Sequence, residues 1–268
     1  MEELYLYCLR ERTESAPAIT TKGIDGKGEV FVFPYRELEA IVSNSPEEFT
    51  SEEIQKKAQE DLNWIKEKAV AHEKVIEQAM GKDNEALSLI PMRFGTIFKD
   101  ATSLEESLDE NYSKIREVLQ RIRGKQEWSV KVYLKDKRLI ERRVKETNEA
   151  IKEKEKEIAS LPEGMAFFME EELKEAISKE LDRELNNIVD VLFEGLEKHT
   201  AESVKCKILE KELTGRQDPM VLNAACLICE EEIEDFRKEA EDLNQKIQAE
   251  GFCLEYSGPW PAYNFTSY

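Results

Sequence analysis

Alternating apolar positions and short turn segments predict that the first half of the chain begins with strands. Residues 4–9 carry apolar side chains on both alternating faces, which is typical of a strand buried on both sides. Further short strands follow wherever apolar runs are bounded by glycine or proline. The strands are expected at residues 4–9, 30–33, 38–42 and 86–90.

Two helices are predicted between and after these strands. Thr50 and Glu53 form a capping-box pattern at the start of a helical region that runs to about Met80. Thr102 and Glu105 repeat that pattern before a second helix, which ends at Gly124. Its apolar stripe consists of Leu104, Leu108, Ile115, Leu119 and Ile122.

A new pattern begins after Gly124, so we predict an N-terminal α+β domain over residues 1–124 and a C-terminal domain over residues 125–268. The second domain follows the order strand, helix, strand, strand, helix, strand. This order is that of the split βαβ, or ferredoxin-like, unit, an antiparallel sheet with two helices on one face. The fold class is therefore α+β. The strands are expected at residues 127–134, 203–209, 221–229 and 252–256, and the helices at 136–199 and 231–250.

The first helical region of the second domain, about residues 136–199, is too long for its sheet. The sequence SLPEG at 160–164 is expected to fold it into a protruding, coiled-coil-like hairpin. The second arm carries one apolar stripe, formed by Leu173, Ile177, Leu181, Leu185, Ile188, Leu192 and Leu196. The first arm has a weaker stripe, formed by Ile140, Val144, Ile151 and Ile158.

The strand at 221–229 is apolar on both faces, although the two helices of such a unit cover only one face of the sheet. The other face is expected to be covered by the first domain, by the inserted helices or by a partner.

Composition agrees with a folded protein that has long solvated helices. Hydrophobic residues make up 40% and charged residues 36% of the 268 residues. The formal net charge is −19, which repels nucleic acid and anionic membranes. We therefore expect neither a nucleic acid nor a membrane as partner. The N-terminus has no secretory signal pattern, and the five scattered cysteines suit reduced thiols in a cytosol.

No group of residues has the spacing of a catalytic, cofactor or metal site. His72 has no second histidine four residues away, and His199 ends a helix, where a cation is favoured. Cys226 and Cys229 lie three apart in a predicted strand, so their side chains point to opposite faces. The expected catalytic, metal and cofactor residues are none, and we predict that the protein is not an enzyme.

One segment departs from the overall acidity. Residues 121–157 contain 13 Lys/Arg and 8 Asp/Glu, a local charge of +5. A solvated helix with ion pairs between neighbouring turns is the favoured interpretation, and a basic patch for an acidic partner is the alternative.

Two motifs are not explained by composition. PMRFGT at 91–96 combines a proline, a cation, an aromatic ring and a flexible glycine. GPWPAYNF at 258–265 has prolines after Gly258 and Trp260, which favour an extended backbone and exclude a central strand. Intramolecular packing that latches the terminus is favoured over a displayed peptide that binds a partner.

Together with the sequence that opens the second domain, these motifs resemble the gas vesicle protein GvpF/GvpL family. The resemblance covers nearly the whole chain, in the expected order. Its principal residues, which we predict to form a partner-binding surface or an interdomain latch, are Pro91, Arg93, Phe94, Gly95, Trp128, Lys131, Gly258, Pro259, Trp260, Pro261, Tyr263 and Phe265.

The resemblance implies an accessory or minor component of gas vesicles. Such a protein is expected to bind the hydrophobic shell protein GvpA, with other gas vesicle accessory proteins as further partners, and to assist nucleation or assembly by limiting aggregation. Binding is expected through sheet edges or an apolar groove near the domain junction. The implied location is the gas vesicle, with a cytoplasmic stage before assembly. The alternatives are a structural component retained in the shell, and an enzyme or binding module for a small ligand.

The tail makes a prediction of its own. It is expected to reach the first domain, near Arg93 and Phe94, with Trp260 mostly buried in the same chain. An exposed Trp260 would instead favour the displayed peptide.

Overall fold

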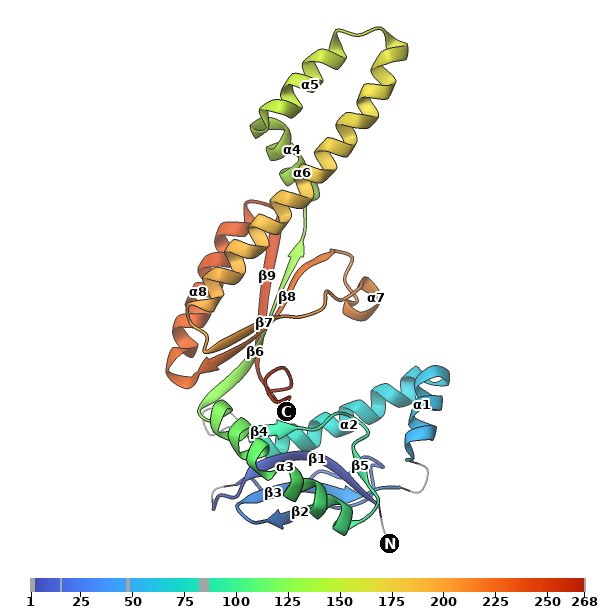
Figure 1. Ribbon diagram of the computed structural model, residues 1–268, viewed down its shortest axis with the longest axis vertical. Coiled ribbons are helices and arrows are strands. Elements are labelled where there is room, and N and C mark those ends of the chain that lie inside the picture. The colour runs from blue at the N-terminus through green and yellow to red at the C-terminus, as the bar shows by residue number, and fades with distance from the viewer. Residues whose placement is uncertain (1–2, 15, 47–48, 82–86, 268) are drawn as a thin grey trace. The chain divides into compact units, whose positions relative to one another are not determined.

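The computed structural model describes residues 3–14, 16–46, 49–81 and 87–267 (Figure 1). The chain divides into two compact units: Met1–Glu127 with Gly258–Tyr268, and Trp128–Ser257. Each unit combines an antiparallel sheet with helices, so the fold is α+β. The units differ from the predicted domains in two respects: the first unit extends to Glu127 and not to residue 124, and the residues after Ser257 belong to the first unit and not to the second.

The first unit is built on a five-stranded sheet with β1 in its centre. On one side β1 pairs antiparallel with β3, which pairs with β2, and on the other side it pairs with β4 and β5. The strands are β1 (Leu4–Glu11), β2 (Val30–Tyr35), β3 (Leu38–Asn44), β4 (Leu89–Pro91) and β5 (Ile97–Phe98). The predicted strand at 86–90 corresponds to β4, and its first residue, Ala86, lies outside the described residues.

Strand β1 is buried on both faces, as its sequence predicts. Tyr5 and Tyr7 share one face, where their rings lie 5.6 Å from the ring of His72 on helix α2 (Leu62–Met80). Leu4 and Leu6 alternate with them and are also buried. Helix α3 (Ala101–Ile122) packs against β1, β4 and β5 and buries the predicted stripe.

The helix starts were predicted with mixed success. Thr50 caps α1 (Ser51–Glu60) by accepting the Glu53 amide, as expected, but Asp61 then ends α1 and caps α2. The predicted Thr102–Glu105 cap is wrong: Asp100 and Ser103 form the capping box of α3, two residues earlier. Asp100 is preferred because its backbone is extended and its carboxylate reaches the Ser103 amide.

The second sheet has the strand order β7-β8-β6-β9, so β6 and β8 are central. The strands are β6 (Lys125–Leu134), β7 (Glu202–Lys205), β8 (Met220–Cys229) and β9 (Phe252–Trp260). The helices of this unit are α4 (Lys137–Thr147), α5 (Glu149–Ala159), α6 (Glu163–Glu197), α7 (Lys211–Thr214) and α8 (Ile233–Gln248), the last preceded by the 3-10 turn Glu230–Glu232. The ferredoxin-like classification stays a prediction.

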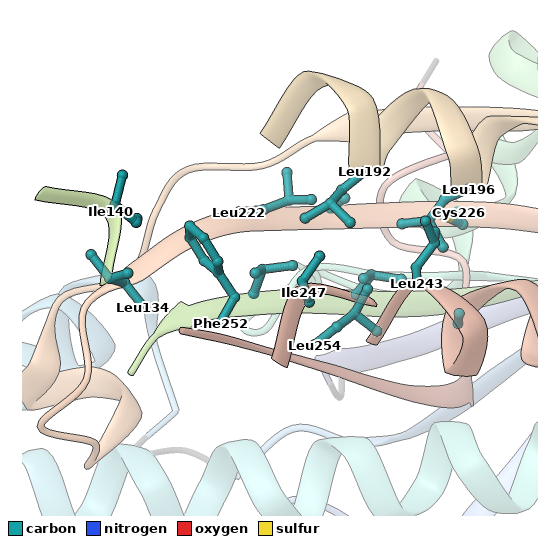
Figure 2. Packing of buried hydrophobic residues seen from close by; sticks show 14 of the residues in the cluster. Leu134, Ile140, Leu192, Leu196, Leu222, Cys226, Leu243, Ile247, Phe252 and Leu254 are labelled. Atoms are coloured by element: carbon teal, nitrogen blue, oxygen red, sulfur yellow. The ribbon is translucent and has the colours of Figure 1, made fainter. Parts of the chain in front are cut away.

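Helices α6 and α8 cover one face of this sheet. In Figure 2, Leu192 and Leu196 of α6 and Leu243 of α8 converge on side chains of the sheet. Cys226 is part of the same core, so it serves there as a small apolar residue. The sheet contributes Trp128, Val130, Val132 and Leu134, which alternate along β6 and so share a face.

The predicted helical hairpin is present, but its first arm is broken. Asn148 ends α4 and caps α5, and both helices pack along α6 (Figure 1). The apolar stripe of the second arm packs into or against the core, most deeply at Leu181, Leu192 and Leu196. Figure 1 shows α5 and the start of α6 extending beyond the sheet of this unit.

The opposite face of β8 is also covered. Ala225 and Leu227 alternate with the core-facing residues and are buried. Part of this face is closed by the loop before β8, because the Arg216 guanidinium lies 4.1 Å from the ring centre of Tyr133 on neighbouring β6. The segment between α7 and β8 therefore covers part of the apolar face of β8 that α6 and α8 leave open.

Candidate functional site

The PMRFGT motif forms a tight loop between β4 and β5 in the first unit. Pro91 is the last residue of β4 and lies opposite Cys8 in the sheet. Gly95 has a φ of +84°, a conformation that other residues rarely adopt. The Thr96 amide and hydroxyl both donate to the Arg93 carbonyl, at 3.2 and 2.7 Å. The glycine is thus required by the turn itself.

A buried histidine fixes this loop to the rest of the first unit. His72 Nε2 lies 3.0 Å from the carbonyl oxygen of Met92, and its Nδ1 lies 2.9 Å from the hydroxyl of Tyr5. A carbonyl can only accept, so Nε2 carries the proton and the Tyr5 hydroxyl donates to Nδ1. The Gly95 amide in turn donates to the Tyr5 oxygen at 3.0 Å. His72 and Tyr5 therefore hold both ends of the loop.

The surroundings of His72 keep it neutral. Burial lowers its pKa to about 4, although the hydrogen bond to Met92 opposes this shift. Burial also raises the pKa of Tyr5 above its usual value. Phe94 packs edge-on against His72 and against Phe49. His72 is therefore a neutral imidazole that uses both nitrogens in hydrogen bonds and packs among aromatic rings. Its role is to position the loop.

The C-terminal tail, residues 258–267, is bound to the same unit by hydrogen bonds from Asn264, Tyr263 and Arg121. Asn264 donates its backbone amide and its side-chain amide to the two carboxylate oxygens of Glu127, at 3.0 and 2.7 Å. The Tyr263 hydroxyl donates to Glu73 on α2 at 2.6 Å. Arg121, near the end of α3, donates to the carbonyl oxygen of Phe265. The tail thus docks on its own chain, as the latch hypothesis expects.

The prediction that Trp260 is mostly buried is wrong, because 44% of this residue is exposed. Pro261, Ala262, Phe265 and Thr266 are buried in the tail. Beneath Trp260, Pro261 and Ala262 lies a cavity of about 20 Å³, room for about one water molecule. Trp260 is the last residue of the edge strand β9, and its indole lies partly at the surface there. An exposed Trp260 is the feature that favours a displayed peptide over a latch, so this one side chain fits the displayed-peptide alternative.

The acidic partners of the tail are unusual among the many carboxylates of the chain. Glu127 is 6% exposed, and burial raises its pKa despite the two hydrogen bonds from Asn264. Burial likewise raises the pKa of Glu73, with the bond from Tyr263 opposing the shift. Each carboxylate depends on the tail for the hydrogen bonds that replace water.

Replacing Asn264 by alanine is expected to loosen the tail. The substitution leaves one oxygen of Glu127 without the side-chain amide, so the free energy of unfolding should fall by about 1–2 kcal/mol. Amide hydrogen exchange should rise in residues 262–266. Ser267→Ala, an exposed change in the same tail, is the control and should leave both measurements unchanged. Equal exchange in the two variants would contradict the latch.

The predicted site residues do not form one cluster. Pro91, Arg93, Phe94 and Gly95 lie in the loop held by His72. Gly258, Pro259, Trp260, Pro261, Tyr263 and Phe265 lie in the tail held by Glu73, Glu127 and Arg121. The tail was expected near Arg93 and Phe94. Helix α2 links the two groups, since it supplies His72 to the loop and Glu73 to the tail.

Trp128 and Lys131 belong to the second unit. The ring of Trp128 packs against Phe236 and Tyr256, with the guanidinium of Arg237 4.8 Å from its centre. Trp128 is 3% exposed and is a core residue. Lys131 is half-buried on β6. A role of these two residues in partner binding stays a prediction.

Over the described part of the chain, no group of three or more His, Cys, Asp or Glu side chains is arranged to hold a metal ion. Within the same residues, no helix has the length and apolarity needed to cross a membrane.

Comparison with known proteins connects this arrangement to a family. Residues 3–267 match the profile described as gas vesicle synthesis protein GvpL/GvpF. The chain belongs to the GvpL/GvpF family. Since the match spans both units and the tail, it confirms the resemblance that the three motifs indicate.

Relatives of both family types are similar along most of the chain. Gas vesicle protein L1 of Halobacterium salinarum is 24% identical over 270 residues, which cover 97% of this chain and 89% of the relative. Gas vesicle protein F of Nostoc sp. is 27% identical over 199 residues, covering 73% of this chain and 75% of the relative. These GvpL/GvpF relatives are named as gas vesicle proteins and not as enzymes.

Solved structures of GvpF share the fold. The crystal structure of GvpF from Anabaena sp. PCC7120 aligns with a TM-score of 0.75 at 21% identity, covering 100% of this chain and 99% of that one. GvpF from Microcystis aeruginosa aligns with a TM-score of 0.68 at 19% identity over the full length of both chains.

The sequence motifs missed the residues that hold this member of the GvpL/GvpF family together at the tail. Glu73 and Glu127 accept hydrogen bonds from the tail but have no distinctive spacing. One signal was present: Glu127 directly precedes the alternating apolar run that starts at Trp128, where a charged residue has to find a partner.

Proposed function

We propose that this protein is an accessory protein that binds the hydrophobic shell protein GvpA, assists nucleation or assembly of gas vesicles and limits aggregation of the shell protein. Membership of the GvpL/GvpF family, whose profile is described as gas vesicle synthesis protein, is the observation that carries the proposal. Other gas vesicle accessory proteins are further partners in this proposal.

The charge of the chain supports a role in keeping an apolar client dispersed. A formal net charge of −19 makes the protein highly soluble and repels other copies of the same chain. A complex of this protein with an apolar subunit keeps the negative charge. Electrostatic repulsion between such complexes then opposes their aggregation.

Strand β7 offers an edge to which a strand of the client can add. It pairs with β8 on one side only, in the register Val204 opposite Ala225. The Cys206 amide donates to the Asn223 carbonyl, so alternation turns the backbone groups of Ser203 and Lys205 away from β8. Val204 is 38% exposed beside this edge. An edge of this kind suits β-augmentation by a strand-rich client.

The test is co-purification of GvpA with the tagged full-length chain at low salt. Wild-type protein should retain GvpA. Lys205→Pro, which removes an outward amide from the edge, should reduce retention by about tenfold or more. Lys205→Ala is the matched control, because it loses the same contact with Asp190 but keeps the amide, and it should retain GvpA. Circular dichroism confirms that all three chains are folded. No retention by folded wild-type protein would overturn the proposal.

A second candidate function is a structural role in the finished vesicle. The partly exposed Trp260 favours it, because an aromatic side chain displayed beside a docked tail can contact a neighbouring subunit. Immunodetection in intact, washed vesicles separates the two roles: a retained protein is found with the vesicles, and an assembly helper is found only in the cytoplasmic fraction.

A further inference from the structure

The turn of the helical hairpin carries three large apolar side chains that the fold does not bury. Met165, Phe167 and Phe168 lie in the first turns of α6 and are 61%, 61% and 74% exposed. The two phenylalanine rings touch edge to face, with centroids 5.9 Å apart. Figure 1 places this end of the hairpin beyond the sheet of its own unit. The three side chains therefore form an apolar tip that is available to a partner.

The phenylalanines are not part of the seam that joins the two arms. That seam follows Leu173 and Ile177, which pack against the core. Helical spacing places Phe167 above Glu170 and Glu171, and Phe168 above Glu171 and Glu172, all of which are exposed. Two aromatic residues thus stand on the charged, solvated face of α6. Packing of the hairpin does not require them there.

The charge around the tip indicates which kind of surface it fits. Residues 165–175 contain four Glu and one Lys, a local charge of −3. The opposite arm adds no compensating excess, because α5 has four Glu and three Lys. An apolar tip with an acidic border is repelled by an anionic membrane and complements an apolar surface bordered by cations.

We propose that Met165, Phe167 and Phe168 form a docking surface for a protein partner whose exposed apolar patch is bordered by lysine or arginine side chains. The choice of GvpA as that partner rests on the proposed function. The apolar and acidic character of the tip is independent of it. The tip contacts the apolar patch through the two rings, and the glutamates behind them face the basic border. It acts separately from the edge of β7.

The first experiment measures the chemistry of the tip directly. Fluorescent amphipathic helical peptides of leucine and lysine, or of leucine and glutamate, are titrated with the full chain. The Leu/Lys peptide should bind wild-type protein about tenfold or more tightly than the double variant Phe167→Ser/Phe168→Ser. The Leu/Glu peptide should bind weakly to both.

Val191→Ser is the matched control, since Val191 is 63% exposed on the same helix but lies outside the tip. It should bind the Leu/Lys peptide like wild type. The thermal midpoints of all variants should agree, because the substituted side chains are exposed. Equal affinity of wild type and the double variant for the Leu/Lys peptide, or an equal loss in the Val191 variant, would overturn the proposal.

The second experiment asks whether GvpA is the partner. Co-purification is repeated with the double variant and with Val191→Ser. Reduced retention by the double variant alone supports the tip as a GvpA contact. Retention equal to wild type contradicts GvpA as the occupant of the tip and leaves the proposed function standing. If wild type itself retains no GvpA, the proposed function fails. The peptide titration then still tests whether the tip is a docking surface.

Discussion

Gly251→Ala is expected to lower the free energy of unfolding by about 2–5 kcal/mol. Gly251 has a φ of +90°, and a β-carbon on it would lie 2.7 Å from the carbonyl oxygen of Asp136. The left-handed backbone alone costs about 1–2 kcal/mol for alanine, and forced contacts in a packed region add about 1–3 kcal/mol. The backbone has little freedom to move away, since the carbonyl of Gly251 accepts from the amides of Lys135 and Asp136.

Gly215→Ala separates these two contributions. Gly215 has a φ of +68° in the same unit, and none of the described heavy atoms lies within 4 Å of the position of its β-carbon. This variant should therefore show only the conformational cost, about 1–2 kcal/mol. Urea denaturation of both variants measures the difference. If Gly251→Ala costs no more than Gly215→Ala, the contact with Asp136 is not a constraint.

Acidification is expected to destabilise the protein through His72. In the folded protein burial holds the pKa of His72 at about 4, compared with an ordinary value of 6.5. Between these values the unfolded chain binds a proton and the folded protein does not, so stability falls as the pH decreases from about 6.5 to about 4. The full effect is about 3 kcal/mol, of which about 1 kcal/mol is lost between pH 7.5 and pH 5.5.

Urea denaturation of wild type and His72→Gln at these two pH values measures this contribution. Glutamine keeps an amide donor for the Met92 carbonyl but does not titrate. The variant should be less stable at pH 7.5, and its deficit should shrink by about 1 kcal/mol at pH 5.5. The comparison is needed because the pKa values of Glu73 and Glu127 are raised, and their protonation favours the folded state as the pH falls. A deficit that stays constant would contradict a buried neutral His72.

Local patterns in the sequence predicted the elements and their buried faces. The alternation from Trp128 to Leu134 places four side chains in one core, and the stripe from Leu173 to Leu196 follows the second arm of the hairpin. Each pattern depends on one strand or helix and on the one face that it buries. The turn at SLPEG and the end of α3 at Gly124 were predicted for the same reason, because proline and glycine act on their own stretch of backbone.

The tertiary structure decided which distant segments meet. Asn264 reaches Glu127 across 137 positions of the chain, and Tyr263 reaches Glu73 across 190, so no local pattern connects them. Trp260 is 44% exposed at the end of the edge strand β9, whereas its aromatic character alone predicted a mostly buried ring. The sequence by itself determined the helices, the strands, the hairpin and the family, since these follow from local periodicity and short motifs. Only the folded chain decided the docking of the tail and the apolar tip, because burial depends on which surfaces the other elements already occupy.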